Sequence, residues 1–228
     1  MAAHSPSTVA AILVAAGSGQ RLGADVPKAF VQVGDRTLLE HAVRRFTGHR
    51  GVDTVVVVAP AAHVTRAAEL TAVPVVAGGA ERQDSVAAGL AALPYDAEFV
   101  LVHDVARPFV PDAVIDAVIA ALRGGAVAVV PVVPIHDTVR RLDDDGALDG
   151  IVDRARLAAV QTPQGFRREV IAVAHEGAAG VVATDDAALV EASGHRVVAV
   201  AGDDRAFKIT TPLDLAYART MARTGDIR

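Results

Sequence analysis

Two patterns of hydrophobic and polar positions alternate along the chain. Short runs rich in β-branched residues predict strands, and between them apolar residues three and four positions apart predict helices, most clearly at 38–46 and 113–122. Alternating strands and helices predict an α/β fold with a doubly wound, mostly parallel sheet that carries helices on both faces. The strands are expected at residues 9–15, 54–59, 73–76, 99–102, 126–130 and 196–200.

One region, at about residues 132–162, interrupts this alternation. Asp-Gly pairs at 145–146 and 149–150 are turn signals, and the flanking segments 138–142 and 151–152 are expected to pair as a hairpin. An isolated two-stranded hairpin is marginally stable in water. We therefore expect a protruding arm that buries its apolar side against a second copy of the chain and so makes a homodimer. A solvated surface flap is the alternative.

Composition limits the class of protein. A chain of 228 residues with 52% hydrophobic residues suits a single Rossmann-like domain over residues 1–228, with residues 1–8 expected to be a disordered tail. The lack of cysteine excludes disulfides and thiolate chemistry and favours a cytoplasmic location. No secretion signal or membrane span is expected, because no apolar run reaches ~18 residues. A net charge of −5 and an aromatic content of 4% argue against a nucleic-acid partner.

The most informative stretch is 13–28, which reads LVAAGSGQRLGADVPK. A predicted strand runs into a loop with three glycines, and glycine lets backbone N–H groups turn towards a bound anion. Arg21 and Lys28 add two positive charges to this loop. Lys28 is notable because the chain has 20 arginines and only two lysines, the other being Lys208. This combination predicts a site for nucleotide phosphates.

Two known glycine-loop motifs do not fit this stretch. A dinucleotide fingerprint requires G-x-G-x-x-G, but the third glycine, Gly23, comes one position late. A P-loop requires G-K followed by Ser or Thr, and the chain has no such triplet. The longer loop is suited to wrap around a triphosphate, with Arg21 and Lys28 facing the charge that develops on the α-phosphate. A glycine turn with two solvated cations is the alternative.

Two further polar motifs follow predicted strands, where open α/β sheets bind their ligands. In the stretch 78–85, GGAERQDS, the backbone of Gly79 and Ala80 is suited to a base edge, and Ser85 to a sugar or phosphate; an ordinary turn is the alternative.

In the stretch 101–108, LVHDVARP, Asp104 is suited to Mg²⁺ or substrate hydroxyls and Arg107 to a phosphate. A structural ion pair is the alternative. We expect His103 to be packed and hydrogen-bonded, without a catalytic role.

Taken in order, the motifs resemble those of one enzyme family, the 2-C-methyl-D-erythritol 4-phosphate cytidylyltransferases of the non-mevalonate isoprenoid pathway. The resemblance extends from about residue 9 to residue 220. It implies a transferase that moves a cytidylyl group from CTP to the methylerythritol phosphate and releases pyrophosphate, with Mg²⁺ held mostly by triphosphate oxygens. The segments that carry it are AAGSGQRLG with PK, GGAERQDSV, LVHDVARP, DTVR, VDRARL, TPQGF, TDDAALVE and FKITTPLDL.

The resemblance also implies roles for single residues, and it leaves the protein ligands of the metal unknown. Arg21 and Lys28 would stabilise the transition state, and Arg154 and Lys208 would position the methylerythritol phosphate. Family members are homodimers, in which Thr138 and Arg154 would reach the neighbour's site. The residues that would bind CTP are Ala15, Ala16, Gly17, Gly19, Gly79, Ala80, Arg82 and Ser85. Those that would contact the acceptor are Asp104, Arg107, Thr138, Thr162 and Thr184.

The chain departs from the family pattern at two positions. Val105 stands where the family commonly has alanine, and Ala80 where it often has an acid, so any base contact there would come from the backbone. Two other functions stay open: a sibling cytidylyltransferase that acts on ribitol 5-phosphate, and a non-catalytic or NAD(P)-binding Rossmann module.

Overall fold

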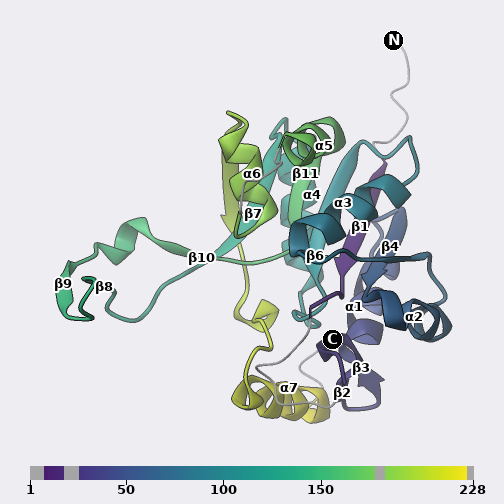
Figure 1. Ribbon diagram of the computed structural model, residues 1–228, viewed down its shortest axis with the longest axis horizontal. Coiled ribbons are helices and arrows are strands. Elements are labelled where there is room, and N and C mark those ends of the chain that lie inside the picture. Colours follow the sequence, from purple (N-terminus) through teal and green to yellow (C-terminus); the bar gives the residue numbers. More distant parts are fainter. Residues whose placement is uncertain (1–7, 18–25, 178–182, 225–228) are drawn as a thin grey trace.

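A computed structural model describes residues 8–17, 26–177 and 183–224 (Figure 1). Its main element is an eight-stranded sheet in the order β10-β7-β11-β6-β1-β4-β5, with β12 paired to the other side of β7. The strands are β1 (Val9–Val14), β4 (Thr54–Ala59), β5 (Val75–Ala77), β6 (Phe99–Asp104), β7 (Ala128–Pro134), β10 (Ala158–Val160), β11 (Gln164–Arg167) and β12 (Val197–Ala201).

Most of this sheet is parallel, as the sequence predicts. β1 pairs in parallel with β4 on one side and β6 on the other, β4 pairs with β5 in the same sense, and β12 runs parallel to β7. Residues 9–13 of β1 are fully buried, as expected of a parallel strand that is covered on both faces. β10 and β11 are the exceptions within the main path: β11 runs antiparallel to both β6 and β7, and β10 runs antiparallel to β7.

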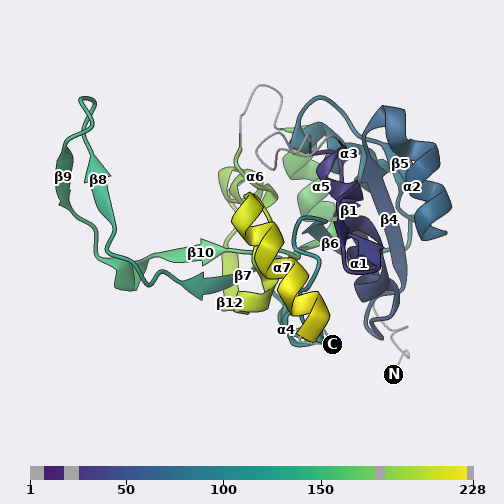
Figure 2. The same ribbon diagram turned by 90° about the horizontal axis from the view of Figure 1, so that it is seen from below.

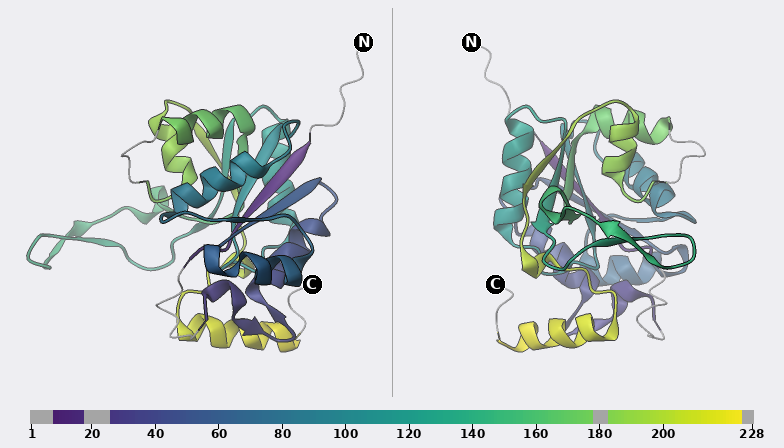
Figure 3. Two further views of the ribbon diagram at one scale, coloured as in Figure 1. Left: turned by 45° about the vertical axis from the view of Figure 1, so that its right-hand side comes forward. Right: turned by 90° about the vertical axis from the view of Figure 1, so that its left-hand side faces the viewer.

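Helices cover the sheet on both faces, which confirms the predicted fold class (Figure 3). Side chains alternate along β1, so Val9, Ala11 and Leu13 belong to one hydrophobic cluster while Ala10 and Ile12 belong to the other. The first cluster contains residues of α1 (Leu38–Thr47), α2 (Val64–Thr71), α4 (Asp112–Arg123) and α7 (Pro212–Thr224). The second contains residues of α3 (Arg82–Ala92), α5 (Arg168–Glu176) and α6 (Asp186–Ala192).

Capping residues explain where two of these helices begin. Thr37 precedes α1 and forms a capping box, in which its hydroxyl accepts from the backbone of Glu40 and Glu40 accepts from the backbone of Thr37. Helix α6 begins at Asp186, because the side chain of Asp185 accepts from the backbone of Ala188 as the N-cap.

Short elements connect the larger ones. The strands β2 (Gln32–Val33) and β3 (Arg36–Thr37) form a small hairpin before α1. Single turns of 3₁₀-helix lie at η2 (Lys28–Phe30), η3 (Ala61–His63), η4 (Arg154–Arg156) and η5 (Asp204–Ala206). None of the helices in the described parts of the chain has the length and apolarity that a membrane span requires.

The predicted arm is present and projects far from the body of the molecule (Figure 2). It ends in a hairpin of β8 (Arg140–Leu142) and β9 (Leu148–Ile151), joined by residues 143–147. The predicted hairpin strands, at 138–142 and 151–152, have different bounds from β8 and β9, and the second Asp-Gly pair lies inside β9 and not in a turn. Gly150, with a φ of 66°, falls at an irregularity in the register, so this pair makes a bulge.

Close packing of α4 on β11 leads to a prediction about Gly165. A Cβ at this position would lie 2.9 Å from Leu122 Cδ1 and closer still to Val118. We expect Gly165→Ala to destabilise the fold by about 1–3 kcal/mol, because the helix would have to move away from the sheet. Urea unfolding measures this cost.

The matched control is Gly177→Ala, at the end of α5. Gly177 has a φ of −79°, and the nearest atom to an added Cβ there is 3.5 Å away. Equal unfolding free energies for the two variants would contradict the packing that the structure shows at Gly165.

Candidate active site

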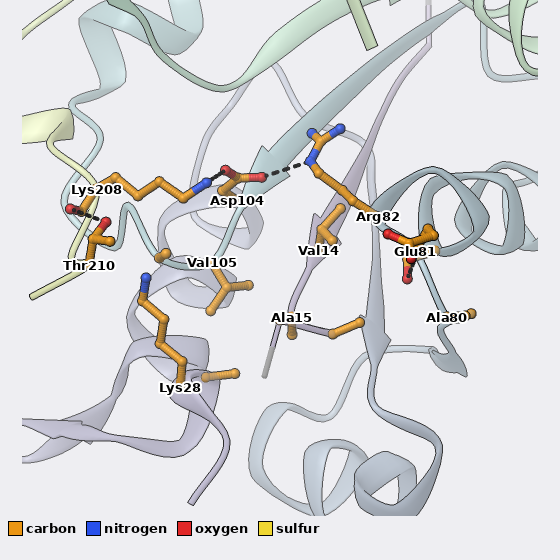
Figure 4. A pocket seen from close by; sticks show the side chains of 16 residues that line it. Val14, Ala15, Lys28, Ala80, Glu81, Arg82, Asp104, Val105, Lys208 and Thr210 are labelled. Carbon is orange, nitrogen blue, oxygen red and sulfur yellow. Dashed lines mark hydrogen bonds and ion pairs between the residues drawn. The ribbon is translucent and has the colours of Figure 1, made fainter. Parts of the chain in front are cut away.

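A pocket of about 580 Å³ opens at the carboxyl ends of β1, β5 and β6 (Figure 4). Parallel strands end at the same edge of a sheet, so the loops that follow them come together there. The loop after β1 contributes Ala15, Ala16 and Gly17. The glycine turn after β5 and the segment after β6 supply the opposite wall, and Lys28, Lys208 and Thr210 enter from other parts of the chain.

Close backbone contact holds the first two loops together. Ala15 N donates to Val58 O at 2.8 Å, and Gly78 N donates to Ala59 O at the same distance. A Cβ on Gly78 would lie 2.9 Å from the Ala16 Cβ and 2.6 Å from Ser85 Oγ, so only glycine fits here. The N-terminus of α3 follows this turn, and the positive end of a helix dipole favours anions at this end of the pocket.

Three cations and two carboxylates line the pocket. Lys208 Nζ donates to Asp104 Oδ2 at 2.6 Å, and Arg82 Nε donates to Asp104 Oδ1 at 3.4 Å (Figure 4). Lys28 extends into the same space from η2, while Glu81 lies at the exposed start of α3. The side chains are therefore arranged to bind an anionic ligand, with Asp104 holding two of the cations in place.

The charge state of Asp104 follows from these contacts. Burial acts to raise the pKa of this carboxyl, but the positive charges of Arg82 and Lys208 outweigh it and hold the pKa well below its usual range. Asp104 is therefore ionised at neutral pH. It serves as a fixed anion and not as a proton donor.

A buried hydrogen-bond chain supports the backbone of Asp104. The Asp104 amide donates to Thr162 Oγ1 at 3.1 Å, Thr162 Oγ1 lies 3.0 Å from His103 Nδ1, and His103 Nε2 lies 3.1 Å from Arg107 O. A carbonyl accepts only, so Nε2 carries the proton and Nδ1 accepts from the threonine hydroxyl. Burial lowers the pKa of His103 to about 4. His103 is thus a neutral, packed histidine, as the sequence suggests.

Arg107 connects the segments on either side of the pocket. Its Nη1 donates to Ala206 O at 2.7 Å and its Nη2 to Val160 O at 3.2 Å. It therefore joins the end of the arm to the segment that carries Lys208, and it lies outside the pocket lining. Burial lowers the pKa of its guanidinium. A phosphate contact by Arg107 stays a prediction.

The structure brings most of the predicted residues into one pocket. Thr162 lies behind the pocket and supports Asp104, Thr184 is exposed before α6, and Thr138 and Arg154 are exposed on the arm, where Arg154 donates to His136 O. Gly19 and Arg21 lie outside the described residues. Those that line the pocket are Ala15, Ala16, Gly17, Lys28, Gly79, Ala80, Arg82, Ser85, Asp104 and Lys208.

Sequence reasoning missed several lining residues. Thr210 lies two residues after Lys208, and Glu81 comes directly before Arg82. Both belong to motifs that carry the family resemblance, so proximity to Lys208 and Arg82 is the signal that points to them.

An open, mostly parallel α/β sheet with cationic side chains around its strand ends defines a nucleotide-binding α/β enzyme. Residues 9–224 match the family model described as IspD, 2-C-methyl-D-erythritol 4-phosphate cytidylyltransferase. The chain belongs to this family.

Relatives and solved structures agree with this assignment. The cytidylyltransferase of this name from Rhodococcus opacus is 50% identical over 219 residues, which cover 95% of this chain and 96% of the relative. The one from Nocardia farcinica is 50% identical over 223 residues, covering 96% of each. The crystal structure from Thermus thermophilus has a TM-score of 0.81 and 40% identity, covering 93% of this chain and 98% of that one. The matches favour the methylerythritol phosphate enzyme over both alternatives that the sequence left open.

The burial of neutral His103 predicts a pH dependence of stability. Its pKa is about 4 in the folded protein and 6.5 in a model compound. Between these values the unfolded chain binds a proton that the folded protein does not, so this group makes the protein less stable as the pH falls from 6.5 towards 4. The loss amounts to about 3 kcal/mol, at 1.4 kcal/mol for each pH unit.

His103→Gln removes this titration while keeping a side-chain N–H donor. We expect the unfolding free energy of the variant to fall less steeply with pH over this range than that of the wild type. Parallel pH profiles, or an NMR titration of the His103 ring with an ordinary midpoint, would contradict the neutral assignment.

Proposed function

We propose that this protein transfers the cytidylyl group of CTP to 2-C-methyl-D-erythritol 4-phosphate and releases pyrophosphate. The observation that carries this proposal beyond family membership is the position of the two lysines. The chain has only two lysines, Lys28 and Lys208, and both line the same pocket. They come from segments far apart in the sequence, which meet where an anionic substrate would bind.

The chemistry requires two anions to meet. A phosphate oxygen of the acceptor attacks the α-phosphorus of CTP, a new P–O bond forms, and the bond to the bridging oxygen breaks as its electron pair leaves with pyrophosphate. No covalent intermediate on the protein is needed. The main obstacle is repulsion between the substrates, so catalysis consists of positioning and charge neutralisation.

The pocket divides naturally between the two substrates. Lys28 and Lys208 both line the pocket, and Lys208 contacts Asp104 at the end of β6. Lys28 would stabilise charge on the α-phosphate together with Arg21, and Lys208 would hold the acceptor phosphate. Gly79, Ala80 and Ser85, at the start of α3, would contact the cytosine and ribose, and the backbone of residues 15–17 would contact the triphosphate.

Mg²⁺ fits this pocket as a partner of the triphosphate. Within residues 8–17, 26–177 and 183–224 there is no group of three or more His, Asp or Glu side chains that could hold a metal. Asp104 is ionised but already contacts Arg82 and Lys208, so it would offer at most one ligand. The ion would be held mostly by phosphate oxygens and would neutralise charge on the pyrophosphate.

The arm would complete the site of a second subunit. Its tip exposes Leu142, Leu148 and Ile151, at 65%, 64% and 71% of their surfaces. Apolar side chains so exposed on a two-stranded hairpin favour an interface with another copy of the chain. Thr138 and Arg154 do not line the pocket of their own subunit, which supports their use in the partner's pocket.

The proposed reaction is tested by pyrophosphate release. The assay contains Mg²⁺ and CTP with either methylerythritol 4-phosphate or ribitol 5-phosphate, and each arm is repeated with the other nucleoside triphosphates. Release with CTP and methylerythritol phosphate alone supports the proposal. Release with ribitol phosphate would change the acceptor, and release with neither would refute the proposed activity.

For Lys28 we predict a loss of rate without a loss of structure. Lys28→Ala should lower kcat by about 10²–10³-fold, because the charge that develops at the α-phosphate loses one stabilising cation. Steady-state kinetics and thermal unfolding are measured on the same preparation. Arg123→Ala, an exposed cation at the end of α4, is the control and should keep wild-type kinetics.

For the arm we predict a loss of association. Ile151→Asp should shift the protein from dimer to monomer in sedimentation velocity, because it places a charge in the apolar tip. Val173→Asp on α5 is the control, since Val173 is similarly exposed, at 61%, but lies outside the arm. A monomeric wild type, or a dimeric Ile151→Asp variant, would contradict the interface.

Mixing two inactive variants tests whether Arg154 acts in the partner's site. Lys28→Ala and Arg154→Ala each spoil both sites of a homodimer, but a mixed dimer would have one intact site. An exchanged equal mixture should recover about a quarter of the wild-type activity, as expected for random pairing in a two-fold dimer. No recovery in a mixture that has exchanged subunits would place Arg154 in the site of its own chain.

A further inference from the structure

A line of paired charges continues behind the pocket wall. Asp186 Oδ2 accepts from Arg82 Nη1 at 2.7 Å, and Asp186 Oδ1 lies 3.0 Å from His175 Nε2. The side chains of Asp186 and His175 are only 1% and 5% exposed, and neither lines the pocket. The pocket residue Arg82 is therefore held from behind by two side chains that a bound substrate would not touch.

Arg82 lies between two carboxylates. Its Nε faces Asp104 at 3.4 Å and its Nη1 faces Asp186 at 2.7 Å. Figure 4 shows the side chain reaching up from α3 past Val14, with its guanidinium beside Asp104. The guanidinium is rigid and planar, so two contacts on different nitrogens fix its orientation. Both contacts raise the pKa of Arg82 against the effect of burial, which keeps it charged.

The full line runs from His175 through Asp186, Arg82 and Asp104 to Lys208. It crosses four parts of the fold: α5, the start of α6, the start of α3 and the end of β6, before it reaches the segment that precedes α7. From Asp186 to Lys208 negative and positive charges alternate, and each carboxylate is shared between two partners. Lys208 is thus the last member of a network anchored in the protein interior.

We propose that Asp186 and His175 are positioning residues for the transfer reaction, acting on Lys208 through Arg82 and Asp104. The inference deepens the proposed function and rests on it, because Lys208 is the cation assigned to the acceptor phosphate. Without Asp186, Arg82 would keep only its contact to Asp104. It would then compete with Lys208 for that carboxylate, and the ammonium would lose its fixed place.

His175 orients the Asp186 carboxylate. A carboxylate accepts only, so Nε2 of the ring donates to it, and a buried carboxylate needs such donors to offset its lost hydration. His175 Nδ1 is buried and has no hydrogen-bond partner among the described residues. The contact to Asp186 is thus the one hydrogen bond found for this ring in the described structure. This fits a side chain whose role is to hold that carboxylate.

The test measures kcat/KM for the acceptor, together with stability, in variants of Asp186 and His175. Asp186→Asn removes the charge with little change in volume, and we expect kcat/KM for the acceptor to fall about tenfold, since small displacements of a positioning group have effects of this size or larger. His175→Gln keeps a donor and should stay close to the wild type, whereas His175→Leu should resemble Asp186→Asn. Thermal unfolding of each variant records any loss of stability separately.

A double-mutant cycle shows whether the effect passes through Arg82. If it does, Asp186→Asn should cost nothing further in an Arg82→Gln background, because the connecting residue is already lost. Additive losses would overturn the inference. The cycle compares kcat/KM values of folded enzyme only. A loss of stability in a single variant therefore does not change its outcome.

The chain offers a matched control. His49 Nε2 and Asp116 Oδ1 form a similar pair at 3.3 Å, but it lies beyond the C-terminal end of α1 and outside the pocket. His49→Gln and Asp116→Asn should keep wild-type kinetics. A wild type without turnover would refute the proposed function and the inference together. Normal wild-type turnover with an unchanged Asp186→Asn variant would refute the inference alone.

Discussion

The ion pair between Lys208 and Asp104 joins two residues that are 104 positions apart, and the active-site half of the molecule depends on it. Asp104 ends a strand whose other five residues are buried, so its position is set by the sheet. Lys208 lies on a segment without regular structure between η5 and α7. The ion pair therefore holds the side chain of Lys208 against the end of β6, although Lys208 itself lies outside any helix or strand. Under the proposed function, the Lys208 ammonium would contact the acceptor phosphate, while Arg82 keeps its contact with Asp104.

Hydrogen bonds of nearby backbone groups also hold the segment that carries Lys208 in place. Ile209 N donates to Ala106 O at 2.9 Å, which lays the segment around Lys208 along the loop after β6. Asp214 accepts from the amides of Thr210 and Thr211 at 2.8 and 2.7 Å and so fastens this segment to α7. The pocket is assembled from loops, but each loop is held within one or two residues of a strand or helix. Such support lets irregular segments place charges accurately.

Local patterns in the sequence were sufficient for the central part of the fold. β1, β4 and β6 are continuous apolar runs, and α1 and α4 have clear helical spacing, so their positions follow from short stretches. β11 was not predicted, because its four residues, QGFR, have no run of apolar side chains. It is a strand because β6 and β7 offer unpaired backbone on both sides. β7 extends beyond its predicted end for a similar reason, since β10 pairs with its last residues.

The sequence predicted which residues lie at the site, but not how some of their side chains are held. Glycines and cations just after strands were recognised from the sequence, because parallel strand ends meet at one edge. The orientation of Arg82 was not recognised: it depends on Asp186, which lies 104 positions away on a different helix. Likewise, the sequence alone could not show that Arg107 would face the carbonyls of Val160 and Ala206. The hydrogen-bond partners of Arg82 and Arg107 are determined by packing between segments that are distant in the chain. Such packing produces no periodic pattern in the sequence.

Arg107 also connects the arm to the segment that carries Lys208. One of its nitrogens holds the carbonyl of Val160 at the root of the arm, and another holds that of Ala206, two residues before Lys208. A guanidinium is rigid, so a displacement of the arm root changes the position of the segment that carries Lys208 unless one contact breaks. Under the proposed function, the arm brings Arg154 to the partner's acceptor, while Lys208 serves the acceptor of its own subunit. The half-buried side chain of Arg107 therefore links the arm, whose Arg154 would serve the partner's site, to the segment whose Lys208 would serve the subunit's own site.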